Sequence, residues 1–281
     1  MHSIYPCFWM NSEARMAAEF YLQVFPDAQI TSANAMVVQL ELRGSKFMLL
    51  NGGPLFQANP SISNFVYCGS TEEIDRIYSA LLPGAKVMMP LGAYPWTSRY
   101  AWMTDRFGVS WQLDVDPVRS SQKVVPALLF SAPQANAVAR AVHHYTTIFK
   151  PSMVLMEAPH NPQSGAEEGS LLFAQFRLRT SLFNAMSSLE KQDFQFTPGN
   201  SLVVECETQL EIDQLWKALG EGGQYQMCGW LVDQFGVSWQ IIPSVLPQLL
   251  NDEHQRLRVM DALMPMQKLE ISTLLQASAN A

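Results

Sequence analysis

An eight-residue stretch at 105–112 returns at 233–240 with one residue changed. The first copy reads DRFGVSWQ and the second reads DQFGVSWQ. Each copy predicts a tight turn at Phe-Gly, where glycine accepts a positive φ, followed by a half-buried strand. In the first copy Val109 and Trp111 then point to one side of the strand, and Ser110 and Gln112 point to the other. The chain is therefore a duplicated protein, and the functional question is what the Ser and Gln side contacts.

The sequence around each octapeptide is a longer repeat, which we also call a copy. Each of these two copies is predicted to contain two units with the order strand, helix, three strands. The first unit has a strand at 4–10, a helix between Ser12 and Pro26, and strands at 29–35, 36–43 and 46–51. The second unit begins with a strand at 64–68 and a capping box at 70–73, which starts a helix that ends at Gly84. Strands are predicted near 86–89, 99–104 and 109–115. The first copy therefore consists of two βαβββ units.

From residue 124 the same order starts again. Tyr21 matches Tyr145 at an offset of 124, Gln39 matches Gln175 at 136, and Trp102 matches Trp230 at 128. The drift in the offset locates insertions and deletions. The second copy gains residues in a hairpin at 157–169, and residues 90–98 of the first copy have no counterpart.

These patterns predict an α+β protein of two tandem domains. Each domain is expected to be a pair of βαβββ units that form one cupped mixed sheet covered by helices. The predicted boundaries are 1–116 and 124–246, with a linker at 117–123. Residues 247–281 are predicted to form two amphipathic helical segments, broken at Pro265, that pack on the domains or on a second subunit.

Composition excludes several classes of partner and location. A length of 281 residues with 48% hydrophobic residues is enough for two cores. A net charge of -7 without a dense Lys/Arg cluster argues against nucleic acid. We expect no membrane segment or signal peptide, and so a cytoplasmic protein. The four cysteines form no CxxC pair, so we expect small buried thiols rather than disulfides or a zinc site.

Several motifs resemble those of a known family. Tandem βαβββ units that end in Asp-x-Phe-Gly-x-Ser-Trp-Gln resemble the vicinal oxygen chelate superfamily, which includes glyoxalase I, extradiol dioxygenases and bleomycin-resistance proteins. Four segments resemble more narrowly the PhnB-like branch, whose members often carry the label 3-demethylubiquinone methyltransferase. They are PCFW at 6–9, EFY at 19–21, CGWL at 228–231 and RVMDALM at 258–264. The resemblance covers nearly the whole chain and implies a glyoxalase-like fold.

In metal-dependent members of that superfamily, ligands of His, Glu or Gln type come from the first, fourth, fifth and eighth strands of a domain. The resemblance places these positions within about one residue. The first-strand position falls at Pro6 and Pro126, and the fourth-strand position at Met48 or Leu50 and at Asn184 or Met186. The fifth-strand position falls at Ser63 or Asn64 and at Ser201 or Leu202, and the eighth-strand position at Gln112 and Gln240. One amide in each cup does not make a metal site. The five histidines lie outside the predicted cup strands. We therefore expect no metal and no other cofactor, unless Glu41 or Glu205 reaches a cup and helps to hold a divalent ion.

Members without metal ligands can hold an apolar or aromatic molecule between the walls of the cup, which requires aromatic surface and a few polar anchors. The predicted ligand-binding residues are Ser63, Tyr67, Trp96, Arg99, Trp102 and Gln112 in domain one and Asn184, Trp230 and Gln240 in domain two. Domain one is the better candidate because its aromatic rim is longer. Two alternatives stay open: the Gln side chains could form a structural network, and Arg99 could fix the rim loop.

The sequence leaves three hypotheses about the function of the protein. The leading hypothesis is a metal-free protein that binds or sequesters a small molecule, with aromatic compounds among the candidate ligands. The alternatives are a metal-dependent lyase, isomerase or dioxygenase of the glyoxalase type, and a structural or interaction scaffold that pairs with another chain, for example as a homodimer. Methyl transfer is not expected, because Gly52-Gly53 and the glycines at 220–223 do not lie between a strand and a following helix. No catalytic residue is predicted.

Overall fold

The computed structural model describes residues 3–115 and 121–279. The chain divides into two compact units, one made of Tyr5–Asn200 and the other of Ser201–Ala281 with Met1–Ile4. We call them the larger and the smaller unit. Of the predicted linker at 117–123, the described residues include only 121–123.

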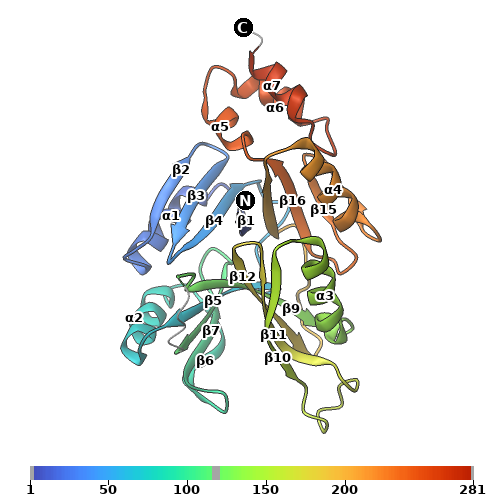
Figure 1. Cartoon of the computed structure of the whole chain (residues 1–281). Helices are drawn as coiled ribbons and strands as arrows, with labels where there is room; N and C mark the ends of the chain where they lie inside the picture. The colour runs from blue at the N-terminus through green and yellow to red at the C-terminus, as the bar shows by residue number, and fades with distance from the viewer. Residues whose placement is uncertain (1–2, 116–120, 280–281) are drawn as a thin grey trace. The chain divides into compact units, whose positions relative to one another are not determined.

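Four βαβββ modules follow one another along the chain (Figure 1). The first consists of β1 (Ile4–Met10), α1 (Ala14–Val24), β2 (Gln29–Ala33), β3 (Val37–Leu42) and β4 (Ser45–Asn51). The second consists of β5 (Ile62–Cys68), α2 (Thr71–Leu81), β6 (Lys86–Tyr94), β7 (Thr97–Thr104) and β8 (Ser110–Val115). The third consists of β9 (Val124–Ser131), the 3₁₀ turn η1 (Ala135–Ala137), α3 (Val138–Ile148), β10 (Ser152–Pro159), β11 (Leu171–Leu178) and β12 (Ser181–Ser188). The fourth consists of β13 (Asn200–Cys206), α4 (Gln209–Gly220), β14 (Gln224–Tyr225), β15 (Trp230–Val232) and β16 (Ser238–Pro243).

The larger unit contains an eight-stranded mixed sheet with the order β10-β11-β12-β9-β5-β8-β7-β6. The second and third modules meet where β5 runs antiparallel to β9, with Ser63 opposite Ala127 and Phe65 opposite Val125. This sheet therefore takes strands from both sides of the predicted linker. The repeat boundaries at 1–116 and 124–246 describe the duplication in the sequence, and they do not coincide with the boundaries of this sheet.

The repeated octapeptide folds as the sequence predicts. Gly108 has φ 84° and Gly236 has φ 89°, so both turns use the left-handed region that glycine favours. Trp111 and Trp239 are fully buried. In the larger unit Trp111 packs among Tyr21, Phe25 and Phe47, so this side of β8 contributes to the core. The alternation of the strand consequently places Gln112 on the opposite face.

One predicted loop is a hairpin. Residues 90–98, expected to be a rim loop, continue the antiparallel pairing of β6 and β7, with Gly92 opposite Tyr100 and Tyr94 opposite Thr97. Three register shifts interrupt this pairing, and this irregularity explains why residues 90–98 show no clear strand pattern in the sequence. The second copy has only the short strands β14 and β15 at this place.

The smaller unit orders its strands β14-β15-β16-β13 and packs α4 on them. Its C-terminal residues form three helices, α5 (Leu246–Asn251), α6 (Arg256–Leu263) and α7 (Ile271–Ala279), rather than the two predicted segments. Backbone hydrogen bonds from Cys228 to Met266 and from Gly229 to Gln267 attach this tail to the residues before β15. The predicted clasp thus packs on its own unit.

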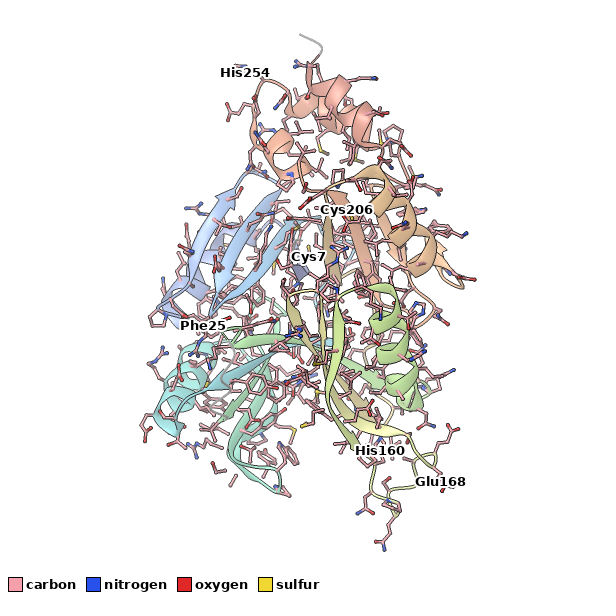
Figure 2. The ribbon with its side chains drawn as sticks, in the orientation of Figure 1. Cys7, Phe25, His160, Glu168, Cys206 and His254 are labelled. Atoms are coloured by element: carbon pink, nitrogen blue, oxygen red, sulfur yellow. The ribbon has the colours of Figure 1, made fainter. Side chains whose placement is uncertain are left out.

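Among the described helices, none is long and apolar enough to cross a membrane. All four cysteines lie within the described residues and are thiols, not half-cystines: Cys7, Cys68 and Cys206 are buried, as the sequence predicts, whereas Cys228 is half-buried. Figure 2 shows the side chains on the ribbon and labels Cys7 and Cys206.

Candidate functional site

The eight-stranded sheet of the larger unit has two different faces. Helices α2 and α3 pack on the outer face, where Trp111, Leu113, Phe176 and Phe183 are buried. The other side, which we call the inner face, carries an aromatic and aliphatic cluster of Phe65, Tyr67, Tyr100, Val125, Ala127 and Leu182, with Met89, Tyr94, Trp102 and Met186 packed against it. This cluster mixes residues of the second and third modules.

Gln112 is the centre of a first polar group on the inner face. Its Oε1 accepts a hydrogen bond from the Tyr100 hydroxyl at 2.6 Å, and its Nε2 donates to Ser63 Oγ at 2.6 Å. Nε2 also lies 3.5 Å from the sulfur of Met186. Gln112, Ser63 and Tyr100 are all buried. Burial, and then the nearby charge of Asp114, raise the pKa of Tyr100 well above its ordinary value, so its hydroxyl stays protonated and donates.

Tyr67 is the centre of a second polar group. Its hydroxyl oxygen accepts hydrogen bonds from Gln175 Nε2 and from Asn184 Nδ2, each at 3.1 Å. Gln175 Nε2 also donates to Asn184 Oδ1 at 3.1 Å. Tyr67 and Asn184 are buried, and Gln175 is half-buried. The three residues come from β5, β11 and β12, so this group exists only because the second and third modules share a sheet.

The grouping differs from the predicted one in one respect. Asn184 was assigned to a domain-two site with Gln240, whereas it bonds to Tyr67 on the same inner face as Gln112. Gln175 was not predicted as a site residue. The signal that could have found it is its match to Gln39 at an equivalent place in the repeat. Phe183, the neighbour of Asn184 on β12, packs against Phe176 on the outer face.

The β6–β7 hairpin adds an aromatic wall beside these groups. Trp96 at its tip is 61% exposed and stacks on Tyr94, with ring centroids 5.2 Å apart. Both rings meet the Tyr100 ring edge-on. Trp102 is half-buried, and its Nε1 donates to Ser110 Oγ at 2.8 Å. The predicted aromatic rim of domain one therefore lies next to Gln112.

Arg99 has the structural role that was left open as an alternative to ligand binding. Its Nε and Nη2 donate to Asp75 Oδ1 of α2 at 2.9 and 2.7 Å. Helix α2 lies on the outer face, so this bond directs the guanidinium away from Gln112. Arg99 ties the hairpin strand β7 to α2 and is not part of the inner face.

The smaller unit repeats part of the arrangement. Gln240 Nε2 donates to Ser201 Oγ at 2.9 Å, which matches the bond between Gln112 and Ser63. Trp230 is half-buried and lies opposite Gln240 in the pairing of β15 with β16. The position that matches Tyr100 at the offset of 128 is Cys228, so the tyrosine of the first copy is not repeated.

The donor set of the inner face does not fit a divalent metal. The positions that hold ligands in metal-dependent members correspond here to Ala127, Asn184 or Met186, Ser63 and Gln112, because Ala127 rather than Pro126 shares the inner face with Ser63. Amides, a hydroxyl and a thioether compete poorly with water for such an ion. Within residues 3–115 and 121–279, no group of three or more His, Cys, Asp or Glu side chains is placed to hold a metal.

The described histidines contribute nothing to the inner face of the sheet. His160, in the loop that follows β10 (Figure 2), has its Nε2 2.9 Å from Ser187 Oγ. His143 lies on α3 and His254 lies between α5 and α6. His144 also lies on α3, and His2 falls outside the described residues.

Fold and site together define the class of protein. The βαβββ modules and the mixed sheet are those of the glyoxalase-like class of fold. Glyoxalase I from Zea mays matches over 90% of this chain and 97% of its own length with a TM-score of 0.57, at 11% identity, which supports the fold alone.

The particular family follows from the sequence. The chain belongs to the family described as 3-demethylubiquinone-9 3-methyltransferase, whose profile matches residues 2–114 and again residues 122–242. The PhnB protein from Bacillus cereus is 28% identical over 41% of this chain and 100% of its own, with a TM-score of 0.39. A search of curated proteins gives no significant match.

The description of the family implies a methyl donor, and the glycine segments do not fit one. A Cβ on Gly52 would lie 2.1 Å from the Trp9 ring, and Trp9 Nε1 donates to the Gly53 carbonyl. A Cβ on Gly220 would meet the Tyr225 ring, and one on Gly223 would meet the Val232 carbonyl. Gly52, Gly220 and Gly223 therefore allow close packing of the chain on itself rather than leave an open cradle for a cofactor.

Proposed function

We propose that the inner face of the eight-stranded sheet binds a small organic molecule without a metal. The molecule would have a planar apolar part and at least one oxygen or nitrogen that forms hydrogen bonds. The observation that carries the proposal is the pair of buried polar groups around Gln112 and Tyr67 within an aromatic and methionine-rich surface.

Energetics favour a functional origin for these groups. Burying amides and hydroxyls costs free energy, and the hydrogen bonds that they form do little more than offset this cost. Apolar residues would fill the same space without it. The Gln–Ser pair is nevertheless present in both copies, as Gln112 with Ser63 and as Gln240 with Ser201. A binding surface has use for such groups because they can exchange their partners for those of a ligand.

The half-buried residues indicate the side of approach. Trp102, Tyr94, Met89 and Met186 pack against the cluster without being fully buried, and Trp96 is exposed at the hairpin tip. Aromatic rings of this kind supply stacking surface, and methionines adapt to irregular shapes. Planar molecules that carry a carbonyl or hydroxyl group are the expected ligands.

The test is a thermal-shift screen with small aromatic carbonyl and phenol compounds, followed by calorimetry on the hits. We expect hits whose Kd rises at least about tenfold, equivalent to ~1.4 kcal/mol, in Tyr67→Phe and in Gln112→Met. Gln240→Met is the matched control from the smaller unit and should leave that Kd unchanged. If no compound binds, or if binding is indifferent to both inner-face variants, the surface is a structural network and the scaffold hypothesis gains support.

Elemental analysis of untagged protein separates the proposal from the glyoxalase-type alternative, which the shared fold alone favours. A bound ion at a hundredfold excess over Kd would raise stability by about 2.7 kcal/mol. About one equivalent of Ni, Zn, Mn or Fe per chain, together with such a shift, would make a metal-dependent lyase, isomerase or dioxygenase the better reading.

A further inference from the structure

Strand β10 forms one end of the eight-stranded sheet and has an unusual surface. Met153, Val154, Leu155 and Met156 follow one another and are 50%, 41%, 44% and 51% exposed. Alternate N–H and C=O groups of an edge strand point away from the sheet, and natural proteins usually protect such edges with charges, proline or a covering element. Between residues 152 and 156 this edge carries no charge and no proline.

The equivalent strand of the first module shows that the fold does not require these residues. At the offset of 124 that matches Tyr21 with Tyr145, strand β2 aligns with β10 residue by residue. Gln29, Thr31 and Ser32 stand where β10 has Met153, Leu155 and Met156. Both strands end a run of hydrogen-bonded strands, and both have a register shift, around Thr31 in β2 and around Leu155 in β10. Ile30 and Val154 are apolar in both strands, and at the other three matched positions β2 is polar where β10 is apolar.

We propose that β10 is a self-association edge, on which a second copy of this chain pairs its own β10 in antiparallel orientation about a twofold axis. An identical strand suits this edge because a twofold contact repeats the same residues on both sides. Met153 and Val154 of one copy would then lie opposite Val154 and Met153 of the other, with Leu155 and Met156 beside them, and the outward N–H and C=O groups would complete a ladder.

The charges that flank the strand favour this direction. Lys150 precedes the apolar stretch and Glu157 follows it, and both are exposed. An antiparallel pairing centred between Met153 and Val154 brings Lys150 of each copy near Glu157 of the other. A parallel pairing would bring the two Glu157 side chains together. Exposed ion pairs add little affinity, so these charges select the orientation while apolar burial supplies most of the binding.

Light scattering coupled to gel filtration tests the proposal on the full chain. Over roughly 1 to 100 µM, a range that detects micromolar affinity, we expect the mass to rise from one chain to two. Leu155→Lys should hold the protein at one chain, because a lysine on an edge strand opposes pairing. The matched control is Thr31→Lys at the equivalent bulge of β2, which should associate as the unchanged protein does.

A second pair of variants tests the orientation. Lys150→Glu should weaken association, and Lys150→Glu with Glu157→Lys should restore it. If Leu155→Lys proves poorly folded by circular dichroism, Leu155→Thr gives β10 the residue of β2 and should weaken association at least several-fold. A single-chain mass at all concentrations, or a dimer that Leu155→Lys and Leu155→Thr leave intact, overturns the proposal.

Discussion

At the scale of single residues, Asp105 shows how the repeated turn is fixed to the rest of the larger unit. Its Oδ1 accepts hydrogen bonds from the backbone N–H groups of Phe107 and Val109, at 2.8 and 3.1 Å. Its Oδ2 accepts from Trp111 Nε1 and from the Tyr21 hydroxyl, each at 2.8 Å. Burial raises the pKa of Asp105, and these four hydrogen bonds oppose that rise. One carboxylate thus connects the turn, strand β8 and helix α1.

Replacing Asp105 by Asn should destabilise the protein by about 2–4 kcal/mol, because one acceptor oxygen becomes an NH₂ group that faces donors. Tyr21→Phe, which removes only one donor, should cost about 1 kcal/mol. Urea unfolding of the two variants measures the difference. Equal losses in both would show that Tyr21 rather than the carboxylate holds the turn together.

Cys68 gives a prediction for alkaline pH. Burial, and then the charge of Glu73, raise the pKa of this thiol from 9.0 to about 12. The unfolded chain therefore loses the thiol proton above about pH 9 while the folded chain keeps it, and deprotonation increasingly favours the unfolded state between pH 9 and pH 12. Stability is complete below this window and falls through it by up to about 1.4 kcal/mol per pH unit from this group.

Cys68→Val should consequently lose less stability than the unchanged protein between pH 9 and pH 11. Denaturant unfolding at each pH measures both curves, and the difference between them removes the contribution of other groups that titrate in this range. Parallel curves would mean that the thiol ionises as easily in the folded as in the unfolded state.

Face assignments at this scale could be read from the sequence, and side-chain partners could not. Alternation along 109–112 places Trp111 in the core and Gln112 opposite, as the structure confirms. The bond between Tyr67 and Asn184 spans 117 positions, and no local pattern encodes it. Arg99 could be assigned to neither role from spacing, because its partner Asp75 lies on a helix that packs against β7 only in the folded unit.

At the scale of elements, helix α2 shows how a predicted cap acquires a second role. Ser70 Oγ accepts from Glu73 N–H, as expected for the N-cap, and Glu73 Oε2 accepts from the N–H of Gly69 at 2.7 Å, one residue before the cap residue that a standard capping box would use. Glu73 Oε1 also bonds to Arg43 Nη2 at 2.6 Å, from the turn between β3 and β4. The side chain of Arg43 is only 14% exposed, so the cap also neutralises a largely buried charge.

Ser70→Ala should cost about 1 kcal/mol, the usual value for a lost N-cap. Glu73→Gln should cost about 2–4 kcal/mol, since it removes the close carboxylate partner of the largely buried Arg43 and leaves only the longer ion pair with Asp27, at 4.0 Å. Arg43→Met combined with Glu73→Gln should recover part of this loss. Thermal unfolding of the four proteins completes the cycle. A Glu73→Gln loss no larger than that of Ser70→Ala would assign Glu73 to capping alone.

Element order was predictable where periodicity is regular, and it failed where the backbone is irregular. The order strand, helix, three strands is correct for all four modules because each helix has an apolar face and most strands are short apolar or alternating runs. Strands near 86–89 and 99–104 were predicted, but their continuation through 90–98 as the β6–β7 hairpin was missed, because three register shifts make the pairing irregular there. The tail divides into three helices instead of two because residues 252–255 interrupt α5 and α6 before Pro265 is reached.

At the scale of the whole molecule, the sequence did not determine which modules share a sheet. Modules two and three share a sheet across the linker, although the repeat would allow each domain to close on itself. Both arrangements satisfy the same local pattern, because each pairs a first strand of one module with a first strand of another. The choice is visible only in long-range contacts such as the pairing of Phe65 with Val125.

This arrangement predicts how the chain responds to a cut. A protease site introduced between residues 117 and 120 should give two fragments that remain together in gel filtration after cleavage, because the β5–β9 ladder joins them. The inner-face cluster also draws on both sides, with Phe65 and Tyr100 before the cut and Val125 and Leu182 after it. Burial of such apolar side chains contributes about 1.5–3 kcal/mol each, enough to hold the fragments at micromolar concentration.

The control is a variant with Val125→Asp, which places a charge in the ladder between the fragments. Its cleaved fragments should separate or precipitate, since an unpaired carboxylate in that apolar cluster is strongly unfavourable. If the unaltered fragments elute as two independent folded species, each repeat folds as its own domain, and the inner face could not combine Tyr67 with Asn184. Association of the fragments is therefore a condition for the proposed ligand site as well as for the sheet, and it can be measured before any ligand is known.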